Sequence, residues 1–233
     1  MVVPIEVARF VLTASVWVLP ALMAITLHEA AHGWAAWRLG DDTAYRMGRV
    51  TFNPLRHIDP FSTILLPAIL LIASGGSFMF GAAKPVPVDV EQLKNPRRDV
   101  MLVAFAGPAS NLLQAMVAAL ALHGVLLLDG NLRNWLGLNL ENAITLNLML
   151  AVFNMIPLPP LDGGRVAVGL LPDRLALPLA RLERLGIPIL LTVLFVIPWL
   201  AGKAGFIVDP FAWLVHGPVH VLKYVIFFVT GWI

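Results

Sequence analysis

The sequence contains no cysteine and few charged residues. Without cysteine the chain cannot form a disulfide, a thiolate zinc site, an iron–sulfur cluster or a cysteine nucleophile, so any metal must bind to His, Asp or Glu. Charged residues make up 13% of the 233 residues, against roughly 25% in an average soluble chain, and 59% are hydrophobic. Such a chain cannot cover a globule with polar surface in water. The composition therefore predicts a membrane protein.

The excess of basic residues is small, with 16 Lys and Arg against 14 Asp and Glu, and no basic cluster with interleaved aromatic residues occurs. A nucleic-acid partner is therefore not expected. We attribute the positive charge to loops that face an anionic membrane surface, which makes the lipid bilayer the expected partner. The sequence gives no indication of the oligomeric state.

Five apolar runs approach or exceed the length of about 20 residues that a membrane-spanning helix needs. These runs are residues 10–37, 61–83, 100–128, 142–161 and 185–202. A sixth run, residues 210–233, is interrupted by Gly217-Pro218 and contains Lys223, so it either spans the membrane or lies in the interface. The pattern predicts an all-α polytopic membrane protein with five to six apolar segments, built as a single integral-membrane domain over residues 1–233. Because Glu6 lies where a signal peptide would be basic, we assign the first 25 residues to the mature chain.

Positive charge is concentrated in three loops, at residues 38–60, 84–99 and 162–184, which the positive-inside rule places in the cytoplasm. Two of these loops flank residues 61–83. That segment is therefore predicted to enter the membrane and return on the same side, as a re-entrant or β-like segment between the first helix and the next full span. Pro67 and Gly75-Gly76 supply the breaks that re-entry needs. The alternative is an ordinary spanning helix that violates the charge rule.

The first apolar run contains the pattern His28-Glu29-Ala30-Ala31-His32. Residues i and i+4 share one face of a helix, so both imidazoles can bind one zinc ion while Glu29 reaches the metal's water. A carboxylate and two imidazoles within a membrane segment are costly unless they serve a site or a polar path. The pattern therefore indicates a site that binds one Zn²⁺ per chain, with a carboxylate within reach of the metal's water.

A catalytic zinc site normally has three protein ligands and an open position for water, so a third ligand is required. Asp162 is the strongest candidate among the other acids and histidines, because it follows a stretch rich in proline, residues 154–161, and precedes Gly163-Gly164. This composition cannot continue a regular helix, and unwound backbone is tolerated in a bilayer where it lines a cavity. The simpler alternative is that Asp162 caps a helix that starts near Gly164.

With these motifs the sequence resembles the site-2 proteases, a family of intramembrane zinc metallopeptidases. The resemblance rests on His28 to His32, on the family's Asn-x-x-Pro-x-Pro-x-Leu-Asp-Gly pattern at residues 154–163, and on Gly107-Pro108-Ala109-Ser110-Asn111. Residues 52–60 and 81–88 also match. The resemblance spans residues 10–165, the expected catalytic core, and leaves residues 185–233 as C-terminal membrane segments. There is no room for the PDZ or CBS domain of many members, so the chain is similar to a compact bacterial form.

The resemblance implies that His28, His32 and Asp162 bind zinc, that Glu29 is the catalytic base, and that the substrate is a transmembrane protein. It also implies a bacterial cell-membrane location, with an active site that opens to the cytoplasmic side. The side-chain amides of Asn111 and Asn154 are candidates for stabilising the oxyanion of the reaction, although each could instead hold helices together.

A substrate helix hides its peptide bonds in its own hydrogen bonds, so it must be unwound and presented in extended form. Residues 81–90, in which Pro85 and Pro87 alternate with valines, suit an extended edge against which a substrate could pair. The alternative for this segment is a surface loop. We expect cleavage to depend on how easily the target helix unwinds.

Two other functions compete with an intramembrane endopeptidase. A zinc-binding transporter or sensor would use the same ligands but would not need an acid between the two histidines, so Glu29 argues against it. A prenyl-protein peptidase would take its third ligand from a Glu-x-x-x-Asp pattern, which is absent. We expect structural roles for the remaining histidines, which are His57, His123, His216 and His220.

Overall fold

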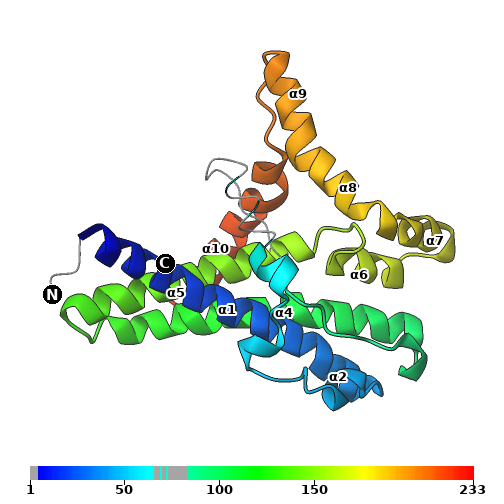
Figure 1. Cartoon of the computed structure of the whole chain (residues 1–233), viewed down its shortest axis with the longest axis horizontal. Helices are drawn as coiled ribbons and strands as arrows, with labels where there is room; N and C mark the ends of the chain where they lie inside the picture. Colours follow the sequence, from blue (N-terminus) through cyan, green and yellow to red (C-terminus); the bar gives the residue numbers. More distant parts are fainter. Residues whose placement is uncertain (1–4, 66–68, 70–71, 73–82) are drawn as a thin grey trace.

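The computed structural model describes residues 5–65, 69, 72 and 83–233, and within these residues the chain is helical and contains no β-strand (Figure 1). Five helical stretches are long and apolar enough to cross a membrane, which confirms the predicted all-α polytopic architecture. They are Ile5–Leu39 (α1), Pro96–Val125 (α4), Gly130–Asn154 (α5), Gly186–Lys203 and Ala212–Val229. The C-terminal run, whose placement the sequence left open, is therefore one of the candidate spans.

The other elements are shorter, and the last two candidate spans are each made of several of them. Before α4 they are α2 (Thr43–Arg46), a 3₁₀ turn (Pro54–Arg56), a π turn (Pro60–Leu65) and a 3₁₀ turn (Val90–Gln92). After α5 they are α6 (Asp162–Leu170), α7 (Asp173–Arg181), a 3₁₀ turn (Leu182–Arg184), α8 (Gly186–Leu191), a π turn (Thr192–Val196), α9 (Ile197–Lys203), a π turn (Ala212–His216) and α10 (Gly217–Val229).

Three long helices, α1, α4 and α5, run side by side and form the centre of the protein, and α6 packs against α4 (Figure 1). An apolar cluster joins α4 and α5 to the C-terminal helix; its buried members are Ala115, Ala118, Ala119, Leu122, Ile144, Leu148, Val215, Val219 and Ile226. The alanines of α4 allow close approach of the neighbouring helices, which is how helices associate where lipid replaces water. By contrast, α8 and α9 extend away from this bundle (Figure 1).

Gly217-Pro218 does not break the last helical stretch, contrary to the expected interruption. A π turn, Ala212–His216, ends directly before Gly217, and Pro218 then lies in the first turn of α10, where its missing N–H is not needed. The same arrangement recurs where the turn Thr192–Val196 precedes Pro198 in α9. The widened turn accommodates the proline ring, so both stretches stay helical.

The span predicted at residues 142–161 occupies different residues in the structure. Helix α5 begins at Gly130 and ends at Asn154, before Pro157. The earlier start shows that polar residues near the membrane surface join the helix, and the end falls where proline removes the next helical hydrogen bonds.

The predicted re-entrant segment falls largely outside the described residues, including Pro67 and Gly75-Gly76. Its described beginning, Pro60–Leu65, is a π turn. After it, residues 83–89 form neither helix nor strand. Because Lys84 and Val86 each precede a proline, their backbone is restricted to extended conformations.

The loops on either side of residues 61–83 meet in the structure, since the Gln92 side chain donates a hydrogen bond from Nε2 to Thr43 Oγ1 at 3.1 Å. We therefore expect Thr43→Cys and Gln92→Cys, each introduced alone into this cysteine-free chain, to react with a membrane-impermeant thiol reagent from the same side. Leu127→Cys is the control: it follows α4 and should react from the other side. Labelling of residues 43 and 92 from opposite sides would contradict their contact.

Candidate functional site

The two histidines of the HExxH pattern lie one turn apart on α1 and direct their Nε2 atoms to the same point. These two atoms are 3.0 Å apart. His28 is buried, and His32 is half-buried. Helix α1 thus brings the imidazoles together as the i, i+4 spacing predicts.

Each imidazole is fixed by a hydrogen bond at its other ring nitrogen. His32 Nδ1 lies 2.7 Å from the carbonyl oxygen of Val103 on α4, and a carbonyl oxygen can only accept, so this nitrogen carries the proton. His28 Nδ1 lies 2.6 Å from Asn111 Oδ1 and donates to it. In a neutral imidazole the remaining nitrogen, Nε2, then has a free lone pair. Both lone pairs face the same space, which is the arrangement of metal-binding histidines.

The orientation of the Asn111 amide follows from its other contacts. Its Nδ2 donates to the Ala24 carbonyl at 3.2 Å and to Asn147 Oδ1 at 2.7 Å, and Asn147 in turn donates to the Ala143 carbonyl at 2.9 Å. The oxygen of Asn111 must therefore face His28. Asn111 is fully buried, and both of its amide hydrogens are donated within the protein. A chain of amides from α5 through α4 thus positions the ring of His28.

Asp162, the first residue of α6, completes the group. Its Oδ2 lies 3.2 Å from His28 Nε2 and 3.4 Å from His32 Nε2. The Asp162 side chain is buried and points its Oδ2 at the two imidazoles.

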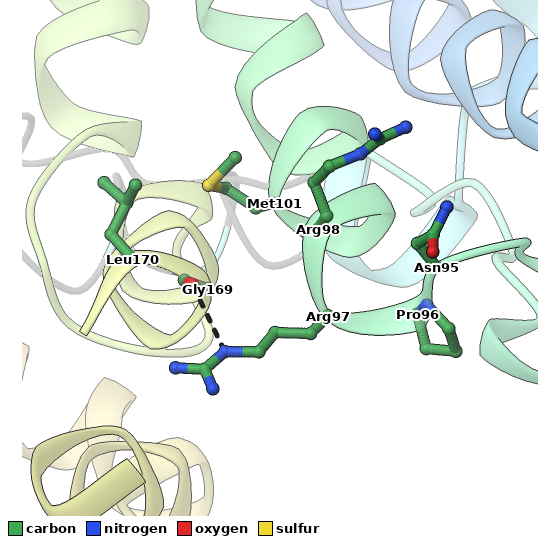
Figure 2. A pocket seen from close by; sticks show the side chains of 7 residues that line it. All are labelled: Asn95, Pro96, Arg97, Arg98, Met101, Gly169 and Leu170. Carbon is green, nitrogen blue, oxygen red and sulfur yellow. Dashed lines mark hydrogen bonds between the residues drawn. The ribbon is translucent and has the colours of Figure 1, made fainter. Parts of the chain in front are cut away.

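The loop before Asp162 is held by close backbone packing. A Cβ on Gly163 would lie 2.3 Å from the carbonyl of Met155, and one on Gly164 would lie 2.1 Å from Pro159 N, so only glycine fits at these positions. At the other end of α6, Arg97 of α4 donates to the carbonyl of Gly169 (Figure 2). Arg97 also donates to the carbonyl of Leu171. Helix α6 is thus fixed at both ends, and Asp162 is directed at α1.

The three atoms that converge, two Nε2 atoms and one carboxylate oxygen, are all acceptors. Asp162 Oδ2 is buried and has no hydrogen-bond donor among the described residues. A cation between these three atoms would satisfy all of them at once. Ligands about 2.0–2.1 Å from a tetrahedral zinc ion are roughly 3.3–3.4 Å apart, close to the separations of 3.0, 3.2 and 3.4 Å here. His28, His32 and Asp162 therefore fit a zinc ion with three protein ligands.

Gly107 of α4 faces the histidine rings directly. A Cβ at this position would lie 2.4 Å from His32 Nε2 and 2.6 Å from His28 Cε1. We expect Gly107→Ala to displace both rings and to lower the zinc content of the purified protein at least tenfold, as measured by elemental analysis after dialysis.

The matched control is Gly124→Ala in the same helix, where a Cβ would meet nothing within 4 Å. That change should leave the zinc content unaltered and stabilise α4 by at most about 1 kcal/mol, the usual difference in helix propensity. Full zinc content in Gly107→Ala would show that the rings tolerate a methyl group and that the observed close approach is not required.

Glu29 is half-buried and lies beside the metal group without belonging to it. Its Oε2 accepts a hydrogen bond from the backbone N–H of Val86 at 3.0 Å. The other carboxylate oxygen, Oε1, has no hydrogen bond among the described residues. Glu29 therefore has one oxygen fixed by the backbone and one available as a base.

Asn154, the last residue of α5, makes a different contact from Asn111. Its Nδ2 donates to the Leu150 carbonyl of its own helix at 3.1 Å. An amide nitrogen has two hydrogens, so one remains for another partner.

The other histidines have the structural surroundings expected for them. His57 is buried and donates through Nε2 to the Thr51 carbonyl at 3.0 Å. His123 stacks on Trp232, with ring centroids 4.3 Å apart, and His216 meets Phe211 edge-on. His220 is exposed on α10. None of them belongs to the metal group.

Sequence reasoning did not identify Asn147, Asp41 or Arg49. Asn147 could have been found, because an amide within an apolar helix needs a polar partner. Asp41 and Arg49 lie in a loop rich in charged residues, where the sequence does not distinguish buried charges from exposed ones. In the structure both are buried.

Comparison with known proteins agrees with this geometry. The chain is 39% identical over 186 residues to "Putative zinc metalloprotease YwhC" of Bacillus subtilis. The aligned region covers 78% of this chain and 80% of that protein. It is 34% identical over 200 residues to "Putative zinc metalloprotease Rip2" of Mycobacterium tuberculosis, covering 83% of this chain and 70% of the relative. The Rip2 protein of Mycolicibacterium smegmatis is 33% identical over 157 residues, or 67% of this chain and 56% of the relative.

No family model matches the chain, and no solved structure matches it. The chain belongs to the zinc metalloprotease family that includes YwhC and Rip2, and zinc is its cofactor.

Proposed function

We propose that this protein is an intramembrane endopeptidase of the site-2 protease type, which hydrolyses a peptide bond within or near a transmembrane helix of a membrane protein. The observation that carries the proposal is the position of the two histidines of the metal group within α1, a helix of membrane-spanning length. His28 lies three helical turns, about 16 Å, before the end of α1 at Leu39. A hydrolytic site at that depth meets peptide bonds that belong to membrane-embedded segments.

The end of α1 nearest to the metal group also indicates which side of the membrane the active site faces. The end of α1 leads into the loop at residues 38–60, one of the three basic loops. By the positive-inside rule this end faces the cytoplasm. We therefore propose that the active site opens to the cytoplasmic side of a bacterial cell membrane.

His28, His32 and Asp162 would hold the zinc ion, which when bound lowers the pKa of water and polarises the scissile carbonyl. Glu29 takes the proton of the attacking water through its free Oε1 and later passes it to the leaving amine. The Val86 N–H keeps the other oxygen of Glu29 in place during both transfers.

The two asparagines take different roles in this proposal. Asn111 has no amide hydrogen left for a substrate, so we assign it to the orientation of His28. Asn154 retains one amide hydrogen and is the candidate for stabilising the developing oxyanion.

An unwound substrate segment needs new partners for its backbone, because unpaired N–H and C=O groups in hydrocarbon cost several kcal/mol. The Val86 N–H is already bonded to Glu29. The N–H of Val88 has no hydrogen bond among the described residues. We therefore propose that an extended substrate pairs with the backbone around Val88, which narrows the edge predicted at residues 81–90.

The experiment uses purified protein in proteoliposomes with single-span substrates that differ only near the cleavage point. Substrates with Gly or Asn there should be cleaved at least tenfold faster than a matched all-Leu helix, because the all-Leu helix resists unwinding. A chelator should stop the reaction. Equal rates for both substrates would show that helix unwinding does not limit cleavage, and no cleavage of any membrane-embedded substrate would contradict the proposed function.

The pairing site is tested with Val88→Pro, which removes the free N–H. Val90→Pro is the control, because Val90 is the first residue of a 3₁₀ turn, where proline is accepted. We expect Val88→Pro to raise KM severalfold while Val90→Pro leaves it unchanged. An unchanged KM in Val88→Pro would place the substrate elsewhere.

A further inference from the structure

Two charged residues near the end of α1 are buried without an ion-pair partner among the described residues. Asp41 is 0% exposed and Arg49 is 5% exposed. Their neighbours Asp42 and Arg46 instead pair with each other at the surface, with 2.6 Å between Oδ2 and Nη2. Burying a charge without a counter-charge is expensive unless hydrogen bonds replace the lost water. For Asp41 and Arg49 these hydrogen bonds go mainly to backbone groups.

Both residues bind the same segment, Lys84–Asp89, at its two ends. Arg49 Nη2 donates to the Lys84 carbonyl at 2.7 Å and to the Pro85 carbonyl at 3.4 Å. Asp41 Oδ2 accepts from the Asp89 N–H at 2.7 Å, and its Oδ1 accepts from the Thr43 N–H at 2.9 Å. The guanidinium of Arg49 thus binds carbonyl groups at one end of the segment, and the carboxylate of Asp41 binds an N–H group at the other.

Besides the contact of the Val86 N–H with Glu29, the segment makes one further backbone hydrogen bond to another part of the chain, from the Lys84 N–H to the His57 carbonyl at 2.9 Å. Pro85 and Pro87 have no N–H, and no strand pairs with the segment among the described residues. Val86 contacts the Gly33 region, where an added Cβ would lie 3.2 Å from Val86 Cγ1. Val88 packs against the apolar cluster of Ala35, Ala36 and Val103. Apolar contacts of this kind are not directional, so they do not determine the register by themselves.

Between the two ends, the Val86 N–H meets Glu29 Oε2. The direction of that N–H depends on the register of the segment. We propose that Asp41 and Arg49 are positioning residues that clamp Lys84–Asp89 across α1, so that Val86 orients the Glu29 carboxylate. The inference rests on the proposed function, because it assigns both residues a role through the proposed catalytic base.

The variants are Asp41→Asn and Arg49→Gln, and their controls are Asp42→Asn and Arg46→Gln in the same loop. Asp41 accepts one hydrogen bond with each oxygen, whereas asparagine has only one acceptor atom, so Asp41→Asn must lose one of the two contacts. Arg49→Lys is the conservative variant, because its ammonium group can still donate to the Lys84 carbonyl.

The first readout does not depend on proteolysis. Val88→Cys, the only thiol in the chain, is half-buried and reports on the position of the segment. We expect Asp41→Asn and Arg49→Gln to speed its modification by a water-soluble thiol reagent about tenfold, because the segment opens more often. The control variants should leave the modification rate unchanged, and Arg49→Lys should restore part of the protection. Unchanged rates in all variants would overturn the clamp.

The second readout is cleavage in the cysteine-free chain, together with the zinc content. We expect kcat to fall roughly 10- to 100-fold in Asp41→Asn and Arg49→Gln, with zinc content unchanged, which is typical for loss of a group that orients a catalytic residue. Arg49→Lys should recover part of the activity. Faster thiol modification with unaltered kcat would overturn the positioning role, and loss of zinc would show that the variants disturb the metal group instead. Failure of the proposed function is distinguishable, because it would be seen in the wild-type chain.

Discussion

Glu29→Gln is expected to lower cleavage by roughly 10²- to 10⁴-fold, the range that general acid–base catalysis contributes, while zinc remains bound. The reason is that the amide cannot take the proton of water, whereas the three side chains that we propose as metal ligands are untouched. The amide oxygen of the substituted side chain can still accept from the Val86 N–H, so the segment around Val86 should stay in place. Single-span substrate cleavage in proteoliposomes and elemental analysis measure the two effects.

The control for this change is Glu91→Gln, which removes an exposed acid outside the site. It should leave both the cleavage rate and the zinc content unaltered. If Glu29→Gln cleaved as fast as the wild type, another group would have to be the base. A simultaneous loss of zinc would mean that Glu29 supports the metal group rather than the proton transfers.

Asp162→Ala is expected to weaken zinc binding at least 100-fold, or about 2.7 kcal/mol, and to abolish cleavage as a consequence. Two imidazoles remain, but Asp162 supplies the only carboxylate of the metal group and lies within 3.4 Å of both Nε2 atoms. A competition titration with a zinc chelator measures the affinity directly.

Two further variants separate ligand loss from unfolding. Asp162→Asn keeps the size of the side chain and can donate to a free Nε2, so it should remain folded while it binds zinc weakly. Asp129→Ala removes an exposed acid between α4 and α5 and should not alter zinc binding. Wild-type zinc affinity in Asp162→Ala would assign the third ligand to another residue.

The parts of the site that obey local rules could be predicted from the sequence. His28 and His32 share a helix face because of the helical repeat, and the apolar run around them determines that α1 is a long membrane helix. Asp162 could be predicted because prolines and glycines before and after it exclude a continuous helix. Boundaries were less predictable: α5 starts at Gly130, since polar residues at its beginning do not interrupt a helix.

The contacts between distant segments could not be predicted. Nothing local to Asn111 indicates that its oxygen faces His28, because that orientation depends on Ala24 of α1 and Asn147 of α5. The requirement for glycine at position 107 likewise arises only when α4 packs against the rings of α1. The contacts of each Nδ1 atom with α4 determine which ring nitrogen carries the proton. They therefore also leave the lone pair of each Nε2 atom free.

The sequence by itself determined that this protein is a helical membrane protein with a metal-binding pattern in its first helix, because composition and short-range spacing control helix formation and which side chains share a face. Tertiary structure alone decided that Asp162 reaches both histidines, that Val86 holds Glu29, and that the buried charges of Asp41 and Arg49 bind backbone rather than each other. The physical reason is that hydrogen bonds between distant segments depend on distance and direction in space, and no spacing along the chain encodes these quantities.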